Sequence, residues 1–139
     1  MIQLGIEWFL YRTQNCCRNR NKYEFFSHTH TWSLHQQQVE QLLTNQEYEL
    51  EKTERLSQAL TGADQAEEVL KKHESFVSSM SSVDERIASL HQDAERLAGN
   101  QDAAKIQERA EKIEERRKKN HEHAEELTKN LRVRVCVQN

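Results

Sequence analysis

The sequence predicts an all-α protein: an antiparallel three-helix coiled-coil bundle with a poorly ordered N-terminal leader and a short C-terminal tail. Its 139 residues contain no Pro and only three Gly, so few residues interrupt a helix. Apolar residues recur about every 3.5 positions over two long stretches, a spacing typical of helices that pack lengthwise against one another. Gly62 and Gly99 fall where the periodic stretches stop. The length fits a single domain.

Aromatic and charged residues divide the chain into three segments. Seven of the nine aromatic residues lie within the first 32 positions, which show no apolar seam. Residues 34–131 contain 14 basic and 21 acidic residues, so this body is more acidic than the net charge of −3 suggests. We therefore expect an aromatic leader over residues 1–33, poorly ordered or marginally helical, then a helical body, then a tail over residues 132–139.

The first helix of the body is expected at about residues 34–60. Its apolar stripe is the weakest of the three, because Gln46, Glu49 and Thr53 interrupt it. The stripe consists of Leu34, Val39, Leu42, Leu43, Leu50, Leu56 and Leu60. We expect this helix to end just before Gly62, since Gly favours the turn that follows a helix.

The second helix, at about residues 64–98, has the strongest pattern. Steps of alternately three and four residues along it meet ten seam positions, of which only His73 is not apolar. Asp64, followed three residues later by Glu67, predicts a capping box at its start. Burying each large seam residue contributes about 1.5–3 kcal/mol, whereas ordering each residue costs about 1.5 kcal/mol. This helix therefore needs partners.

The third helix, at about residues 102–131, has Asp102 as its expected cap. Its seam contains only Arg117 and Asn120 as polar residues. Connections this short make consecutive helices run antiparallel. The structural core that we predict from the seams consists of Val69, His73, Phe76, Met80, Val83, Ile87, Leu90, Leu97, Ile106, Ile113 and Leu127.

Three segments of the second and third helices carry a family pattern. Residues 66–76 read AEEVLKKHESF, residues 83–87 read VDERI, and residues 106–116 read IQERAEKIEER. They resemble the middle and last helices of the spectrin repeat family, the spectrin, dystrophin and α-actinin superfamily, and are nearest to a β-type spectrin chain. The resemblance covers about residues 34–131, close to one full repeat.

The resemblance implies a left-handed three-helix coiled coil. The family usually has a Trp in its first helix, where this chain offers Tyr48 or Leu50, and another in its third helix, where this chain has Arg117. In the tail, Val133 and its neighbours alternate with polar residues, which predicts a strand-like segment instead of a helix that continues into a next repeat. We therefore expect a single repeat that is a fragment of a longer protein.

The function that the resemblance implies is a structural spacer and protein-interaction module of an actin-linked membrane skeleton. Its implied partners are other cytoskeletal or spectrin-family proteins, with the actin network reached indirectly, and its implied location is the cytoplasm, the cytoskeleton and the cell cortex. Two alternatives stay open. One is an oligomeric coiled-coil scaffold, in which two chains pair through the second and third helices. The other is a spectrin-repeat segment of a signalling protein, such as a guanine-nucleotide exchange factor.

We predict no catalytic, cofactor-binding or metal-binding residue. Cys16 and Cys17 are adjacent, which suits zinc poorly even with His28 and His30 nearby, because structural zinc sites separate paired Cys by two to four residues. His73 lies on a seam and is expected to be a core histidine. No Gly-rich phosphate loop and no nucleophile with a neighbouring base are present.

The charged groups of the third helix are expected to face solvent. Residues 116–119 form the only basic run, but surrounding Glu residues balance it and predict a surface salt-bridge lattice that includes Glu114–Lys118 and Glu115–Lys119. His121 and His123 are two positions apart, so they point in different directions and are expected to be solvated.

Composition also excludes several classes of partner. The acidic body lacks the net basic footprint that nucleic acid binding needs. No stretch approaches the roughly 20 apolar residues of a membrane-spanning helix, so we expect no direct membrane insertion. The N-terminal residues do not form a secretory signal, and Cys16, Cys17 and Cys136 do not make a disulfide framework, which predicts an intracellular protein.

Overall fold

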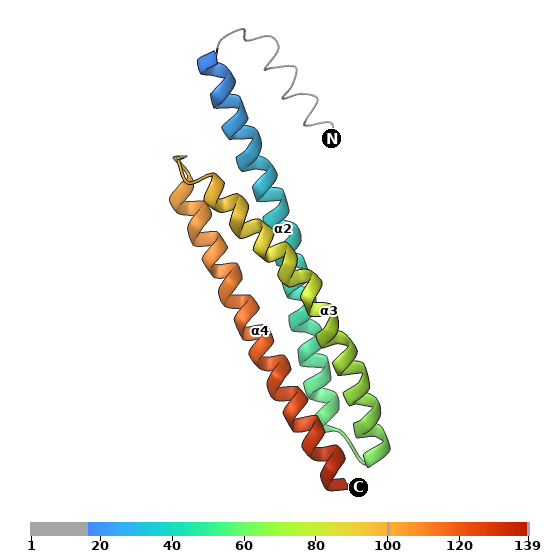
Figure 1. Ribbon diagram of the computed structural model, residues 1–139. Coiled ribbons are helices and arrows are strands. Elements are labelled where there is room, and N and C mark those ends of the chain that lie inside the picture. The colour runs from blue at the N-terminus through green and yellow to red at the C-terminus, as the bar shows by residue number, and fades with distance from the viewer. Residues whose placement is uncertain (1–16, 100, 139) are drawn as a thin grey trace.

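The computed structural model describes residues 17–99 and 101–138, with side chains over residues 28–99 and 101–137. These residues form three helices, α2 (Cys17–Gln58), α3 (Ala63–Arg96) and α4 (Ala103–Gln138), and no strand. The helices run alternately up and down (Figure 1), so the prediction of an all-α three-helix bundle is confirmed. The part of the predicted leader that precedes Cys17 lies outside the described residues.

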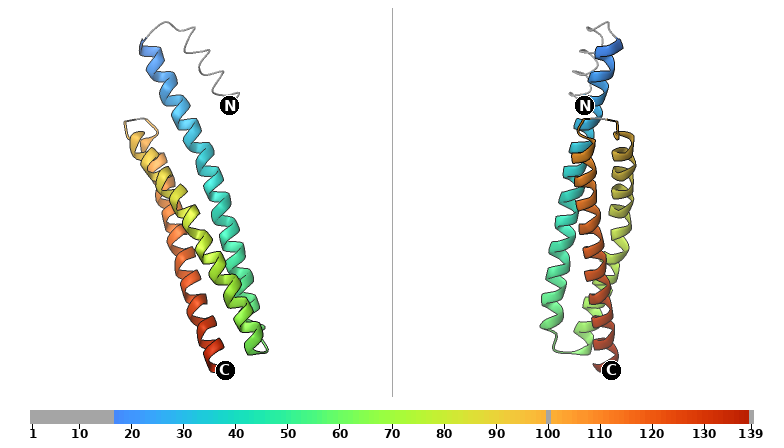
Figure 2. Two further views of the ribbon diagram at one scale, coloured as in Figure 1. Left: turned by 45° about the vertical axis from the view of Figure 1, so that its right-hand side comes forward. Right: turned by 90° about the vertical axis from the view of Figure 1, so that its left-hand side faces the viewer.

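Each helix contacts the other two. Both views in Figure 2 show the three helices side by side over most of their length. The N-terminal part of α2 projects beyond the connection between α3 and α4 (Figure 1). The three-helix section begins near Trp32 of α2, which shares a buried cluster with Leu97 at the end of α3.

The first helix starts at Cys17 instead of about residue 34. Trp32 gives a physical reason for the difference. Its side chain is only 3% exposed, and its indole Nε1 donates a hydrogen bond to the Leu90 carbonyl of α3 at 2.9 Å. A buried aromatic side chain with a satisfied N–H holds the helix against the bundle at this point. A residue that the sequence pattern placed in the leader is therefore a core residue.

The expected strand-like tail is also corrected, because α4 continues to Gln138. Leu131 is fully buried, and Val135, four residues on, is partly buried, so the helical spacing of the seam persists. Arg134 donates a hydrogen bond to the Ser57 carbonyl near the end of α2. The alternation of Val residues is compatible with a strand, but contact with α2 decides for the helix.

The core is divided along the bundle axis into two apolar clusters. The larger one lies near the connection between α3 and α4, and the smaller one near the opposite end. The larger cluster contains Trp32, Val39, Leu43, Ile87, Leu90, Ala94, Leu97, Ile106, Ala110 and Ile113. The smaller cluster contains Leu50, Met80, Ala124 and Leu127.

The predicted core residues lie at different depths. Phe76 and Val83 are partly buried and pack against the two clusters, and Val69 is partly buried beside Phe76 in a groove between α2 and α3. The buried members of the predicted set are His73, Met80, Ile87, Leu90, Leu97, Ile106, Ile113 and Leu127. The predicted core set contains no residue of α2, whose own core positions are Trp32, Val39, Leu43 and Leu50.

The connection from α2 to α3 differs from the expected one. Gly62 has an extended backbone (φ −159°, ψ 163°) and is the N-cap of α3, not the C-terminal residue of α2. Asp64 therefore lies inside the first turn and forms no cap. Gln65 instead ties the first turn of α3 to the residue before the N-cap, because its Oε1 accepts hydrogen bonds from the backbone N–H and the hydroxyl of Thr61 at 3.2 and 2.9 Å.

The other connection follows the end of α3. The backbone N–H groups of Leu97 and Ala98 donate to the carbonyls of Ala94 and Glu95, at 3.2 and 3.1 Å. These short-range bonds tighten the last turn of the helix before Gly99. Gly99 thus follows a helix end, as its place in the sequence predicts.

Candidate functional site

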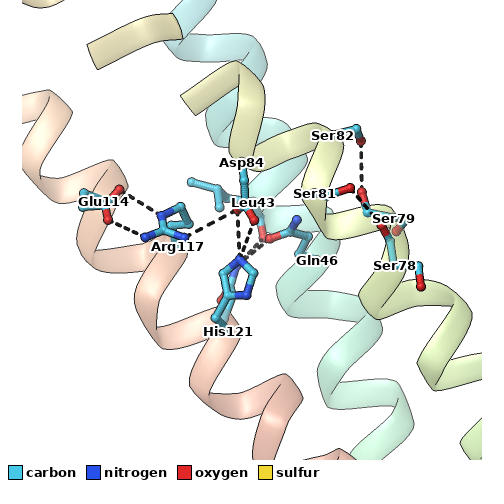
Figure 3. A network of polar contacts seen from close by, with 11 residues as sticks. Leu43, Gln46, Ser78, Ser79, Ser81, Ser82, Asp84, Glu114, Arg117 and His121 are labelled. Carbon is cyan, nitrogen blue, oxygen red and sulfur yellow. Dashed lines mark hydrogen bonds and ion pairs between the residues drawn. The ribbon is translucent and has the colours of Figure 1, made fainter. Parts of the chain in front are cut away.

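A group of polar side chains crosses the middle of the bundle, where apolar side chains would be expected. We call it the polar network. Its members come from all three helices (Figure 3). They are Leu43, through its carbonyl, and Gln46 of α2, Asp84 of α3, and Glu114, Arg117, Asn120 and His121 of α4.

Asn120 and Gln46 are the buried part of this network. The Asn120 amide donates to Gln46 Oε1 at 3.2 Å and to the Leu43 carbonyl at 3.5 Å. Both side chains interrupt the apolar seams of their helices, and the structure brings these two interruptions to the same level. A buried polar group is tolerated when it finds a partner, and such a pair fixes the register of two helices.

Arg117 and His121 form the partly exposed side of the network, facing α3. The Arg117 guanidinium donates two hydrogen bonds to Glu114, at 2.9 and 2.7 Å, and lies 3.7 Å from Asp84. His121 Nε2 is 2.9 Å from both carboxylate oxygens of Asp84. Asp84 therefore connects α3 to two positions of α4 that are one turn apart.

A second Arg links α4 to α2. Arg116 donates to both carboxylate oxygens of Glu47, at 3.1 and 2.9 Å, and to the Thr44 hydroxyl at 3.0 Å. These bonds raise the pKa of Arg116 above its ordinary value. Paired hydrogen bonds between a guanidinium and a carboxylate fix orientation as well as distance. Adjacent residues of one basic run thus hold two different neighbours: Arg116 holds α2 and Arg117 faces α3.

The same chemistry keeps Glu114 ionised. The hydrogen bonds from Arg117 lower the pKa of the Glu114 carboxyl, against the opposing effect of partial burial. The charges of Arg117, His91 and Lys118 act in the same direction as those bonds. A carboxylate that is stabilised in the folded state makes folding depend on pH in the acid range.

We expect Glu114→Gln to weaken the acid sensitivity of the bundle. Because the folded pKa of Glu114 lies below its ordinary value of 4.5, its contribution is present above that pH and is lost as pH falls through the folded value. The carboxylate is partly exposed, so the loss should be about 1 kcal/mol or less. Urea unfolding at neutral pH and at about pH 3.5 measures it. Glu111→Gln, on an exposed site of the same helix, should leave the pH dependence as in the wild type.

His73 is a buried link between α3 and α4. Its Nε2 lies 2.9 Å from the Ala124 carbonyl and 3.0 Å from the Thr128 hydroxyl. Because a carbonyl only accepts, Nε2 carries the hydrogen. Nδ1 is buried without a hydrogen-bond partner. A ring nitrogen committed to a backbone carbonyl serves packing, which is the role that the seam position indicates.

The other two histidines of α4 correct an expectation. His121 and His123 do point in different directions, but they are not simply solvated. His121 contacts Asp84 of α3, whereas His123 Nε2 lies 3.2 Å from Glu54 of α2. Of the expected lattice, Glu115 pairs with Lys119 at 3.4 Å, while Glu114 uses its oxygens for Arg117 instead of Lys118. Both histidines therefore bridge helices, whereas the Glu115–Lys119 and Glu114–Arg117 pairs lie within α4.

The network links α4 to α2 through Gln46 and the Leu43 carbonyl, and to α3 through Asp84. The Asp84–His121 pair resembles an oriented base, but the Ser81 and Ser82 hydroxyls of α3 lie away from His121 (Figure 3) and donate to carbonyls of their own helix, at 3.1 and 2.9 Å. The described residues also contain no group of three side chains able to hold a metal ion. Cys16 of the Cys/His grouping lies outside them.

A groove of about 390 Å³ lies between the upper parts of α2 and α3. Its lining combines the edge of Trp32 and Leu97 with His28, His35 and Asp93. Partial burial and the charge of Arg86 lower the pKa of His35, so its imidazole is neutral at pH 7. The groove is therefore partly apolar, and the charged groups on its α3 side are Asp93 and Arg96, which form an ion pair at 3.5 Å.

Asn120→Ala should destabilise the bundle by about 1–3 kcal/mol, because the buried Gln46 amide loses its partner. The double variant Asn120→Leu/Gln46→Leu should recover that loss, since replacing both partners by apolar groups removes the unpaired amide. Urea unfolding of both variants tests this, with Asn130→Ala on the exposed side of α4 as the control. A double variant less stable than Asn120→Ala would contradict the pairing.

No family model matches the chain, and no solved structure matches it. No described helix combines the length and the apolar character needed to cross a membrane. Sequence reasoning marked Gln46, Arg117 and Asn120 only as interruptions of the seams. The spacing of residues along one helix does not identify which residue of another helix lies opposite, so the pairing of Asn120 with Gln46 was not predicted.

Proposed function

We propose that the chain is a structural spacer and protein-interaction module, a spectrin-like repeat of an actin-linked membrane skeleton. One observation carries this proposal: the apolar seams face one another within a single chain, and the polar side chains between them bind neighbouring helices. Asn120 bonded to Gln46 is the buried example. A chain arranged in this way keeps its two ends at a set separation, carries tension between them, and leaves its outer faces available to partner proteins.

The course of the chain also suits a spacer. The N-terminal end of α2 and the C-terminal end of α4 lie at opposite ends of the bundle (Figure 1). Tension applied to these two ends acts along the bundle axis. Bonds such as Arg116–Glu47 between α4 and α2 then lie between the loaded helices and resist sliding.

The first helix lacks the Trp that the family pattern places where this chain has Tyr48 or Leu50. Leu50 is fully buried at that place, and Tyr48 is 59% exposed. Trp32, sixteen residues before Tyr48, anchors α2 instead, through its buried ring and the bond from its N–H to the Leu90 carbonyl. The third-helix Trp position holds Arg117, so this anchor is replaced by an ionic contact with Glu114.

The two alternatives differ in whether α2 packs against α3 and α4 of the same chain. A scaffold of two chains paired through α3 and α4 needs α2 to lie apart, but α2 contacts both helices through Trp32 and Glu47. A repeat within a signalling protein would use the same bundle. In the spacer proposal the chain has no enzymatic activity, lies in the cytoplasm at the cytoskeleton or cell cortex, and reaches actin through other cytoskeletal proteins.

Stretching the single chain tests the proposal. The chain should be monomeric and elongated by sedimentation velocity at about 2 μM, and a molecule pulled through its two ends should unfold in one cooperative step. Arg116→Ala should lower the unfolding force, and Lys118→Ala, on an exposed neighbouring site, should not. In cell extracts the chain should co-purify with spectrin-family proteins.

Two results would contradict the proposal. A bundle that unfolds on dilution would support the scaffold alternative instead. Co-purification with an exchange factor, without spectrin-family proteins, would favour the signalling alternative.

A further inference from the structure

Two histidines of α4 join all three helices at one level of the bundle. His121 Nε2 lies 2.9 Å from both carboxylate oxygens of Asp84 in α3. His123 Nε2 lies 3.2 Å from the Oε2 atom of Glu54 in α2. We call His121, Asp84, His123 and Glu54 the histidine clamp. One short segment of α4 thus faces both neighbouring helices, and each neighbour supplies a carboxylate.

Protons from solvent can reach the histidine clamp. Its four side chains are between 30% and 48% exposed, so the imidazoles exchange protons while the bundle stays folded. An ordinary histidine changes charge near pH 6.5, whereas Asp and Glu stay ionised down to about pH 4.5. Between these two values each pair of the clamp holds opposite charges.

Asp84 shares its nearest guanidinium with another carboxylate. Arg117 lies 3.7 Å from Asp84, but it donates its two short hydrogen bonds to Glu114, at 2.9 and 2.7 Å. Arg117 and His121 both point toward Asp84 (Figure 3). From α2, the uncharged Gln46 joins the network at this level. A proton on His121 therefore gives Asp84 a positive partner of its own and turns their hydrogen bond into an ion pair.

We propose that the histidine clamp is a pH-sensitive device in which protons bound by His121 and His123 tighten the contacts of α4 with α3 and α2. Each protonated imidazole faces a carboxylate across a helix interface, so the attraction exists in the packed bundle and not in the unfolded chain. This stabilisation is present below the ordinary titration range of histidine and is lost as pH rises through it. The inference needs the folded bundle and no spacer role, so it goes beyond the proposed function.

Three other histidines act against the clamp. Partial burial and the charge of Arg86 lower the pKa of His35, so its protonation favours unfolding. His91 lies 3.9 Å from Glu114, but its Nδ1 atom, like that of His73, is buried without a hydrogen-bond partner. A proton added to either Nδ1 would be unpaired. The total free energy of unfolding thus sums opposing effects, whereas the coupling within one pair isolates the clamp.

A double-mutant cycle at two pH values tests the contact with α3. Urea unfolding is measured at about pH 8 and about pH 5.5 for the wild type, His121→Gln, Asp84→Asn and the double variant. The coupling, expressed as a ratio of unfolding equilibrium constants, should be about two- to fivefold larger at the lower pH, the size expected for a partly exposed ion pair. Gln and Asn keep polar groups at both sites, so the cycle measures the titratable part.

The contact with α2 has its own cycle and a matched control. The cycle of His123→Gln with Glu54→Gln should show the same direction of change. The control is the Arg116–Glu47 pair, which also joins α4 to α2 and contains no histidine. A cycle of Arg116→Gln with Glu47→Gln should give equal couplings at both pH values, because both groups stay ionised over this range.

Equal couplings at the two pH values for the clamp pairs, or larger ones at the higher pH, would overturn the proposal. A change of the same size in the Arg116–Glu47 control would overturn the assignment to histidine. Long-range ¹H–¹⁵N spectra of the wild type cover the case in which a variant does not fold. At about pH 8 His121 and His123 should each carry hydrogen on Nε2, and hydrogen on Nδ1 instead would overturn the contact concerned.

Discussion

Ile87→Asp should unfold the bundle. Ile87 is 1% exposed and lies in the larger apolar cluster, between α2 and α4. An Asp carboxylate at this place would be buried without a partner, which costs several kcal/mol in addition to the lost apolar contact. Since domains of this size are stable by about 5–15 kcal/mol, most of the native state should disappear. Circular dichroism and limited proteolysis measure the loss.

Ala88→Asp is the matched control for this substitution. It adds the same charge one position along α3, at an exposed site, so its cost should be about 0.7 kcal/mol or less. The two variants have the same net charge, which removes any general electrostatic explanation of a difference. A helical, protease-resistant Ile87→Asp chain would show that Ile87 does not face the core.

Trp32→Ala should have the second largest effect, a loss of about 3–5 kcal/mol in the free energy of unfolding. The substitution empties the space between α2 and the end of α3 and removes the hydrogen bond to the Leu90 carbonyl. Urea unfolding measures the loss. Trp32→Phe keeps an aromatic ring without the N–H, so it should cost less than Trp32→Ala.

Two further variants test where along α2 the folded bundle begins. Thr31→Ala, at an exposed neighbouring residue, should be close to wild type. Removal of residues 1–33 should destabilise the chain at least as much as Trp32→Ala, because it deletes Trp32 itself. A truncated chain as stable as the full one would restore residue 34 as the start of the folded unit.

The seams of α3 and α4 were predictable because each is a property of one helix. Ile87 and Leu90 follow the helical period and lie on the same side of α3, so a helix that packs against this side buries both side chains. His73 could be placed in the core for the same reason, although it is polar. The weaker stripe of α2 still identified Leu43 and Leu50, but gave no reason to extend the helix upstream to Trp32.

The polar network was not predictable in the same way. Asp84 and His121 are 37 positions apart in the sequence, and many other carboxylates are available to each histidine of α4. Which pair forms depends on how far α4 is shifted along α3, a quantity that no single helix specifies. The same holds for Glu47, which meets Arg116 only because α2 and α4 lie at matching levels.

Residue spacing alone predicts that this chain is helical, that two of its helices have continuous apolar seams, and where the connections between helices fall. These features depend on neighbours within a few turns, for which residue spacing is sufficient information. Contacts between helices place Trp32 in the core, extend α4 to Gln138 and pair Asn120 with Gln46. Those outcomes depend on the relative shift of three packed helices, because each side chain finds its environment on another helix.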